Sequence, residues 1–107
     1  DFDPLDYYYH AKALAELAPY QTLLQNGKPA DYKGDNPDLQ YTCFASDKEA
    51  LLLIGNYAGA ASDKVNLKLP LSSVTKVLLD GKPLTVKDNS LSLDVPVDRL
   101  RLIYMTK

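Results

Sequence analysis

The 107-residue sequence contains no tryptophan, one cysteine, one histidine and one methionine. A single cysteine, Cys43, allows no internal disulfide, and with one histidine, His10, it cannot supply the four ligands of a structural zinc site. The sequence also lacks a glycine-rich dinucleotide loop, a phosphate-binding loop and a C-x-x-C pair. It therefore predicts no cofactor and no metal.

Long apolar runs and concentrated positive charge are also missing. The longest uninterrupted apolar run, residues 50–54, is far shorter than the roughly 20 residues that span a bilayer. Twelve basic residues against 14 acidic ones give a formal charge of -2, and no basic stripe of the kind that binds phosphate backbones is present. The sequence therefore predicts no membrane span and no nucleic-acid partner.

The acidic residues form no recognisable catalytic pair. Glycosidic hydrolysis needs two carboxylates that face one substrate, roughly 5 to 10 Å apart. Most aspartates lie instead in predicted turns, loops or solvent-facing strand positions, namely Asp35, Asp38, Asp47, Asp63, Asp80, Asp88 and Asp94. Because aspartate is a frequent turn residue, these positions need no catalytic explanation. The domain alone is predicted not to be an enzyme.

What the sequence has in quantity is short alternating apolar runs separated by turn residues. Between residues 74 and 105, the pairs Asp80-Gly81 and Asp88-Asn89 separate such runs and predict a β-meander. Segments 39–46, 49–58 and 64–70 predict three further strands. The run 51–54 is apolar on both faces, which is typical of a central strand that is covered on both sides.

Orientation within the last predicted strand, 99–105, follows from the same alternation. We expect Leu100, Leu102 and Tyr104 to face the core, and Arg99 and Arg101 to face solvent.

The N-terminal segment carries helix signals. Asp3 is a suitable N-cap and Pro4 a suitable first helical residue, whereas Pro19 predicts a break. A short second helix, Tyr20–Gln25, should follow. Residues 28–38 are rich in proline and turn formers and predict a loop, with room for a short extended piece near Tyr32.

These patterns predict a mainly β fold: an antiparallel β-sandwich of about seven to eight strands (39–106), with an N-terminal helical segment (4–26) packed on it. Residues 1–107 are expected to form a single domain. Because the sequence begins at Asp1 without an initiator methionine or a signal-peptide pattern, we expect a segment excised from a longer protein, with a processed mature form as the alternative.

Tyrosines are the candidate functional residues. Tyr7, Tyr8 and Tyr9 fan across roughly 200° of the predicted helix, so a single surface cannot bury them all. They are either half-exposed in a monomer or in contact with a neighbouring domain. Tyr32 and Tyr57 lie in loops of the β region, where they either bind a sugar on their ring faces or pack over the edge of the sandwich.

The order of segments resembles a known arrangement. A helical segment ending in NGKP is followed by EALLLIGNY, VNLKLPLSSVTKVLLDGKPL and SLSLDVPVDRLRLIYM. This order resembles the C-terminal β-sandwich that follows the (β/α)8 catalytic barrel of many bacterial glycoside hydrolases. The barrel is not part of this sequence, so no catalytic residue is carried over.

The resemblance implies a non-catalytic accessory domain that packs against and stabilises the catalytic domain of the same protein. It also implies an exported enzyme of carbohydrate metabolism, periplasmic or extracellular. Two alternatives stay open: a carbohydrate-binding module that uses Tyr32 and Tyr57, and a protein–protein interaction domain.

Overall fold

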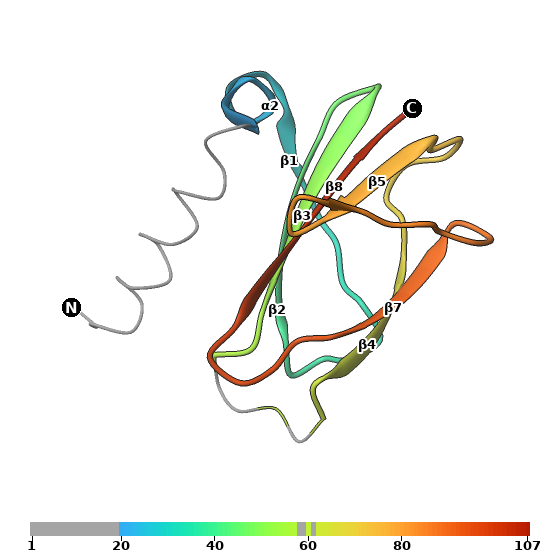
Figure 1. The fold of residues 1–107 in the computed structure, drawn as a ribbon. Helices are drawn as coiled ribbons and strands as arrows, with labels where there is room; N and C mark the ends of the chain where they lie inside the picture. The colour runs from blue at the N-terminus through green and yellow to red at the C-terminus, as the bar shows by residue number, and fades with distance from the viewer. Residues whose placement is uncertain (1–19, 58–59, 61) are drawn as a thin grey trace, which may run out of the picture.

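The computed structural model describes residues 20–57, 60 and 62–107, which form two layers of β-sheet and one short helix (Figure 1). In chain order the elements are α2 (Gln21–Asn26), β1 (Lys28–Ala30), β2 (Gln40–Ala45), β3 (Glu49–Gly55), β4 (Lys64–Lys68), β5 (Lys76–Leu79), β6 (Lys82–Pro83), β7 (Ser90–Asp94) and β8 (Leu100–Thr106). All strand pairs are antiparallel. The predicted mainly β, antiparallel fold is confirmed.

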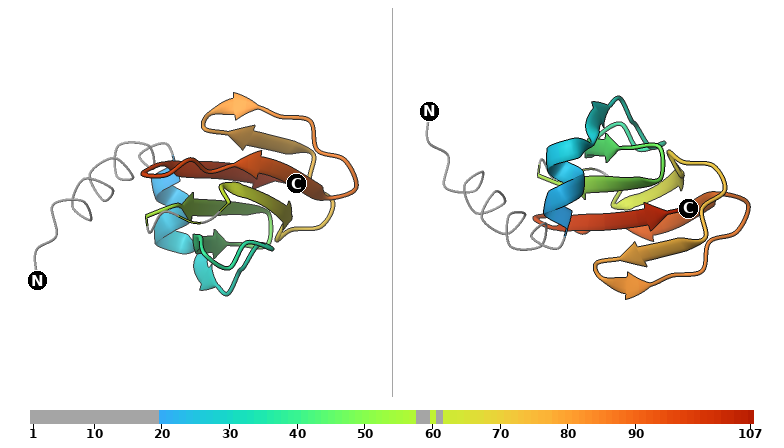
Figure 2. Two further views of the ribbon diagram at one scale, coloured as in Figure 1. Left: turned by 90° about the horizontal axis from the view of Figure 1, so that it is seen from below. Right: turned by 90° about the horizontal axis from the view of Figure 1, so that it is seen from above.

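Six strands form the larger sheet, in the order β1-β2-β3-β8-β5-β6, and β4 and β7 form the smaller one. The smaller sheet covers one face of the larger sheet, and α2 lies on the other face (Figure 2). The core lies between the sheets, and its most deeply buried large side chains include Leu52, Ile54, Val65, Leu67, Val95, Ile103 and Met105.

Strand β3 is buried on both faces and lies inside the larger sheet, between β2 and β8. Leu52 and Ile54 face the core between the sheets, whereas Leu51 contacts Leu23 of α2 and Leu102 of β8 on the other face. The prediction of a central strand with cover on both sides is therefore confirmed. Truncating a leucine at such a site to alanine costs about 2 to 5 kcal/mol of unfolding free energy.

Both predicted hairpin turns are present. Asp80 and Gly81 have φ of 51° and 84°, and Asp88 and Asn89 have φ of 56° and 58°. Two consecutive positive φ angles are what a type I′ turn requires, and aspartate, asparagine and glycine tolerate them best.

The strands that these turns join do not form a meander, so that prediction was wrong. Strands β5, β6 and β8 belong to the larger sheet, whereas β7 pairs with β4. Segment 84–89 passes from one sheet to the other. Alternation of apolar and polar residues indicates that a strand has a buried face, but it does not identify the neighbouring strand.

The predicted orientation of β8 was correct only in part: Leu100 and Leu102 are buried and Arg99 is exposed, but both faces of the strand are covered. Ile103 and Met105 face the core between the sheets, whereas Leu102 and Tyr104 face α2. Arg101 lies on the same face as Ile103, and its guanidinium donates hydrogen bonds to the Asp80 carboxylate (2.7 Å) and to the Asp94 carbonyl (2.6 Å). Because β8 is covered on both faces, a solvent face could not be identified from alternation.

Residues 28–38 are mostly a loop with one short extended piece, as expected, but that piece is β1, Lys28–Ala30, and not the stretch near Tyr32. Strand β1 opens this segment and pairs with β2 at the edge of the larger sheet. Its Pro29 is tolerated because an edge strand leaves one side without ladder hydrogen bonds.

Most of the predicted helical segment 4–26 lies outside the described residues. Its described end is α2, Gln21–Asn26, which begins and ends one residue later than the predicted Tyr20–Gln25. The Tyr20 ring stacks on the Tyr104 ring of β8, with a centroid distance of 4.7 Å and an interplanar angle of 19°. Within the described ranges, no helix has the length and hydropathy needed to cross a membrane.

Candidate functional site

The predicted interdomain residues Tyr7, Tyr8 and Tyr9 lie outside the described residues, as does His10. The two predicted sugar-contacting residues, Tyr32 and Tyr57, are both described. Tyr32 follows β1, and Tyr57 follows β3. The structure gives these two tyrosines different surroundings.

Tyr32 is half-buried beside β4. Its hydroxyl donates a hydrogen bond to the Lys68 carbonyl (2.5 Å), and its ring meets the Tyr41 ring edge to face at a centroid distance of 6.1 Å. Burial, with smaller contributions from Cys43 and Tyr41, raises the pKa of Tyr32 to about 12. This phenol is held in its neutral, hydrogen-bonded form by the packing at the edge of the sandwich.

Neighbours of Tyr32 in the chain also bind the free edge of β4. Asp35 accepts hydrogen bonds from the backbone N–H and the side-chain amide of Asn66, both at 2.8 Å, and these bonds hold the pKa of the Asp35 carboxyl below its usual value. The buried Asn36 amide donates to the Ser62 and Lys64 carbonyls at 2.8 and 3.0 Å. Side chains of residues 32–36 therefore take the place of a further strand beside β4.

A groove of about 500 Å³ adjoins Tyr32, with Lys33, Asp35, Asn66, Lys68 and Ser90 among its lining residues. Tyr57 is not among the residues that line it. Two lysines and an aspartate make this groove charged. Asp35 and Asn66 are bonded to each other, and the Ser92 hydroxyl donates to the Asn66 side chain, so part of the polar surface is occupied by internal hydrogen bonds.

Tyr57 has the more exposed ring, with a residue exposure of 37%. The ring lies directly on Gly55, because a β-carbon added at Gly55 would come within 2.4 Å of the Tyr57 Cζ atom. The Tyr57 backbone N–H donates to the Gln40 side-chain oxygen at 3.5 Å. Glycine in a strand often marks such a close approach, so the spacing Gly55-x-Tyr57 was a usable signal that the sequence reading missed.

The sequence did not predict the burial of two asparagines, Asn36 and Asn56. Asn56 is fully buried, and its amide donates to the Val95 carbonyl (2.8 Å) and accepts from the Ala60 N–H (3.0 Å). Its backbone bonds to Asp98 and Arg99 in the loop before β8. Asn56 thus joins the loop after β3 to the loop between β7 and β8. Asparagine in a loop predicts a turn, and nothing in the sequence distinguishes the buried, loop-linking Asn56 from an ordinary turn asparagine.

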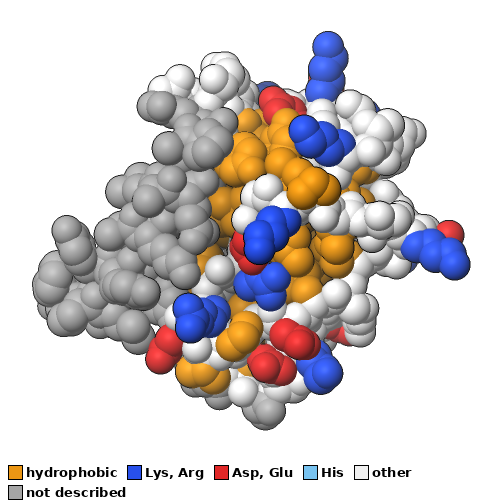
Figure 3. Space-filling view, viewed as in Figure 1, with side chains coloured by type: hydrophobic (Ala, Val, Ile, Leu, Met, Phe, Trp, Pro, Cys, Tyr) orange, Lys and Arg blue, Asp and Glu red, His pale blue; other side chains and the backbone are white. Residues whose placement is uncertain are grey.

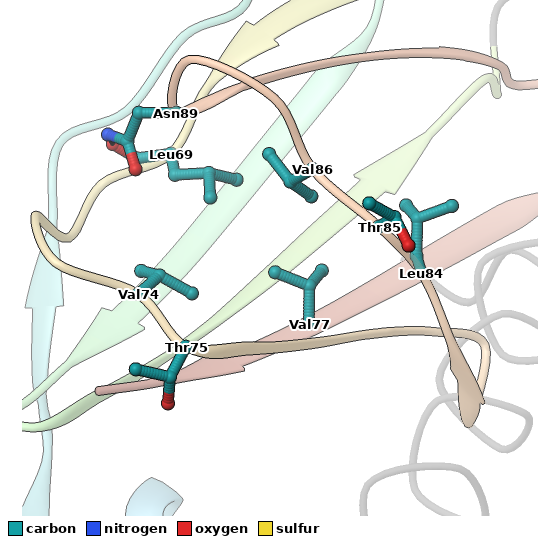
Figure 4. A pocket seen from close by; sticks show the side chains of 8 residues that line it. All are labelled: Leu69, Val74, Thr75, Val77, Leu84, Thr85, Val86 and Asn89. Carbon is teal, nitrogen blue, oxygen red and sulfur yellow. Dashed lines mark hydrogen bonds between the residues drawn. The ribbon is translucent and has the colours of Figure 1, made fainter.

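A hollow of about 260 Å³ lies between β5 and segment 84–89. Leu69, Val77 and Val86 point into it from three separate segments (Figure 4). Figure 3 shows hydrophobic side chains at the middle of the face that carries β5 and β7, with lysine and arginine side chains around them. Thr75, Thr85 and Asn89 also line the hollow, so it combines valine and leucine side chains with polar groups at the place where the chain changes sheets.

Reactive and metal-binding clusters are not found among the residues that the structure describes, since no group of three or more histidine, cysteine, aspartate or glutamate side chains is placed to hold a metal ion. Cys43 is buried, and burial raises the pKa of its thiol, which agrees with the structural thiol expected in a strand. The Asp80 carboxylate accepts from the Leu102 N–H (2.9 Å) and from Arg101, so it supports the turn.

No family model matches the sequence, and no curated protein matches it. A solved structure does match: the crystal structure of a GH30 endoxylanase from Clostridium papyrosolvens C71, with a TM-score of 0.60 and 13% sequence identity. The alignment covers 88% of this chain and 26% of that chain. This chain has the fold of one part of a glycoside hydrolase. The resemblance inferred from segment order is thus confirmed for the fold, and this chain spans about a quarter of the length of its structural neighbour.

Proposed function

We propose that this chain is a non-catalytic accessory domain of a glycoside hydrolase, which packs against the catalytic domain and stabilises it. The observation that carries the proposal is the asymmetry of the structural match. Nearly the whole of this chain superimposes on a small part of an enzyme chain. The remainder of such an enzyme would hold the catalytic domain, which is the missing partner of this one.

The described carboxylates support a structural role. Asp80 binds the backbone of β8 and Arg101, Asp35 binds Asn66, and Glu49 accepts from the Tyr104 hydroxyl. A glycosidase needs two carboxyl groups that converge on an open substrate site. These three carboxylates are instead hydrogen-bonded to parts of the fold.

Tyr7, Tyr8 and Tyr9 are the proposed contact with the catalytic domain. They precede α2, which packs on the face of the larger sheet that the smaller sheet leaves uncovered. An exported enzyme, periplasmic or extracellular, is part of the same proposal and rests on the resemblance described above.

Two proteins test the docking role: the full-length protein encoded by the gene's complete reading frame, and the 107-residue chain alone. In both, Tyr7, Tyr8 and Tyr9 are changed together to serine. We expect the full-length protein to lose about 2 kcal/mol or more of interface stability, and the melting temperature of its catalytic domain to fall. The isolated chain serves as the matched control and should change far less.

Equal shifts in both proteins would contradict docking, because the tyrosines would then act within this domain. An unchanged full-length protein would contradict it as well. The isolated chain should also show no hydrolysis of xylan or other polysaccharides. Hydrolytic activity that co-purifies with the chain would refute the non-catalytic role.

A further inference from the structure

The groove beside Tyr32 lies on the side of the molecule opposite α2. Its lining includes exposed residues of the smaller sheet, Asn66 and Lys68 of β4 and Ser90 of β7, together with residues 32–35. The smaller sheet covers one face of the larger sheet, and α2 packs on the other (Figure 2). A catalytic domain that docks beside α2 would therefore leave the groove open. The groove volume of about 500 Å³ falls in the range of roughly 300 to 1,000 Å³ that is typical of small-molecule sites.

Two lysines in the groove have no anionic partner within the described part of the chain. Lys33 and Lys68 are exposed, and neither forms an ion pair with any residue that the structure describes. Lys64, which also projects from β4, lies 4.0 Å from the Asp94 carboxylate. With two lysines and one aspartate among its lining residues, the groove is positively charged. A carboxylate of a ligand can accept charge-assisted hydrogen bonds from either ammonium group.

The same groove also offers oxygen acceptors. An ionised carboxylate has about four lone-pair sites, and Asp35 uses two of them for the backbone and side-chain N–H groups of Asn66. The Ser90 hydroxyl donates to the Lys87 carbonyl at 3.3 Å, which leaves the lone pairs of its own oxygen available. Ammonium donors beside oxygen acceptors match a ligand that carries carboxylates and hydroxyls together. A ligand without hydroxyls cannot donate to Asp35 and Ser90.

Tyr32 supplies an aromatic ring whose position is fixed. Its hydroxyl donates to the Lys68 carbonyl, and its ring meets the Tyr41 ring edge to face. Because these contacts already order the ring, little side-chain entropy remains to be lost when a ligand covers it. Tyr32 and Lys33 also line a second hollow, of about 550 Å³, so the groove continues past the ring toward Tyr41. The C–H face of a pyranose is apolar and suits an aromatic ring, which favours a sugar acid over an acidic peptide.

We propose that this groove binds an acidic oligosaccharide, one whose pyranose rings carry carboxylates. The carboxylates bond to the ammonium groups of Lys33 and Lys68. Sugar hydroxyls donate to the Asp35 carboxylate and the Ser90 hydroxyl, and one sugar ring lies against Tyr32. This binding role goes beyond the docking role and does not depend on it, because the two roles use opposite sides of the domain.

The test uses the whole 107-residue chain, labelled with nitrogen-15. Hexagalacturonic acid is the acidic probe, and maltohexaose is a neutral probe with the same number of sugar rings. We expect saturable NMR shifts at Lys33, Lys68 and Ser90 with the acidic probe, with a dissociation constant of about 1 mM or lower. Maltohexaose should bind at least about tenfold more weakly. Raising the salt concentration from about 20 to 500 mM should weaken binding of the acidic probe, because salt screens exposed charges.

Changing Lys33 and Lys68 together to glutamine should weaken binding of the acidic probe by about tenfold or more. Changing both to arginine keeps the charges and should retain most of the affinity. The matched control changes Lys76 and Lys82 together to glutamine, which removes the same charge from exposed positions on β5 and β6 outside the groove. All four lysines are exposed, so these variants should fold.

Hexa-aspartate serves as an acidic peptide probe and should bind more weakly than hexagalacturonic acid. Equal or tighter binding of hexa-aspartate or of maltohexaose would overturn the proposal. So would the absence of saturable shifts with the acidic sugar, shifts centred away from the groove, or an unaltered affinity in the Lys33→Gln/Lys68→Gln protein. An equal loss of affinity in the control variant would overturn it as well, since the attraction would then come from overall charge.

Discussion

Replacing Asn56 by alanine should strongly destabilise the sandwich. The side chain is fully buried, donates to the Val95 carbonyl at 2.8 Å and accepts from the Ala60 N–H at 3.0 Å. Alanine would leave both backbone groups without this partner. A buried polar group that loses its hydrogen bond costs about 1 to 3 kcal/mol. Val95 is fully buried, whereas Ala60 is half-buried and can reach water, so we expect a total loss of about 2 to 4 kcal/mol.

Urea unfolding followed by circular dichroism measures this loss. The midpoint should fall while the slope of free energy against urea stays the same, because the surface exposed on unfolding hardly changes. Asn26→Ala, at the exposed end of α2, is the matched control and should shift stability by no more than about 0.5 kcal/mol.

Asn56→Asp tests the same two hydrogen bonds through the pH dependence of stability. The introduced carboxyl keeps an acceptor for the Ala60 N–H but can donate to the Val95 carbonyl only when protonated. Burial disfavours its charged form, so its pKa should be higher in the folded than in the unfolded chain. The folded state then binds more protons, and this variant should lose stability, relative to the original protein, as pH rises from acidic to neutral. A loss below about 1 kcal/mol in Asn56→Ala, or no pH dependence in Asn56→Asp, would refute the view that this amide joins the two loops.

Three further outcomes follow from the structure. In a spectrophotometric alkaline titration, Tyr32 should ionise near pH 12. Because this folded pKa exceeds the ordinary value of 10.0, the contribution of Tyr32 to stability should be lost as pH rises from about 10 to 12. Tyr32→Phe should remove that part of the pH dependence. Val86→Ile adds one carbon to a side chain that points into the hollow beside β5, and it should raise the free energy of unfolding by about 0.5 to 1 kcal/mol in urea melts. A loss of stability would mean that the hollow cannot accept the added carbon. Gly34→Ala should cost about 1 to 3 kcal/mol by overpacking, since its β-carbon would lie 2.8 Å from methyl groups of Leu67 and Val65 and from the Tyr41 hydroxyl. Gly81→Ala is the comparison: its β-carbon meets no atom within 4 Å, so it should cost about 1 kcal/mol from its positive φ alone.

Much of the fold could be predicted because its local signals are strong. Asp80-Gly81 and Asp88-Asn89 are pairs that tolerate positive φ, and both turns are present. The double-sided apolar run of β3 correctly placed that strand in the interior of a sheet. These properties depend on a few adjacent residues, which a sequence displays directly.

Strand partners were harder to predict because they depend on residues far apart in the chain. Nothing near Ser90–Asp94 distinguishes pairing with β4 from pairing with β6, since both alternatives bury Leu93. Likewise, Arg101 looked like a solvent-facing residue, and only the distant Asp80 and Asp94 explain its place on the inner side of β8.

The candidate site could be predicted only in part, for a related reason. Tyrosine in a loop suggests exposure, yet Tyr32 and Tyr57 differ in what they contact. Tyr32 is fixed by a carbonyl that lies 36 positions later in the chain, while Tyr57 is supported by a glycine two positions earlier. Only the second relation was visible locally.

The closed edge of β4 affects how this sandwich can serve as a building block. An open strand edge invites pairing with strands of neighbouring copies. Here Tyr32, Asp35 and Asn36 occupy the outward-facing backbone groups of β4, and the terminal strands of the larger sheet, β1 and β6, are short and contain proline. The unit can therefore be grafted onto unrelated polypeptides, or repeated in tandem, with little risk that adjacent copies fuse along these edges.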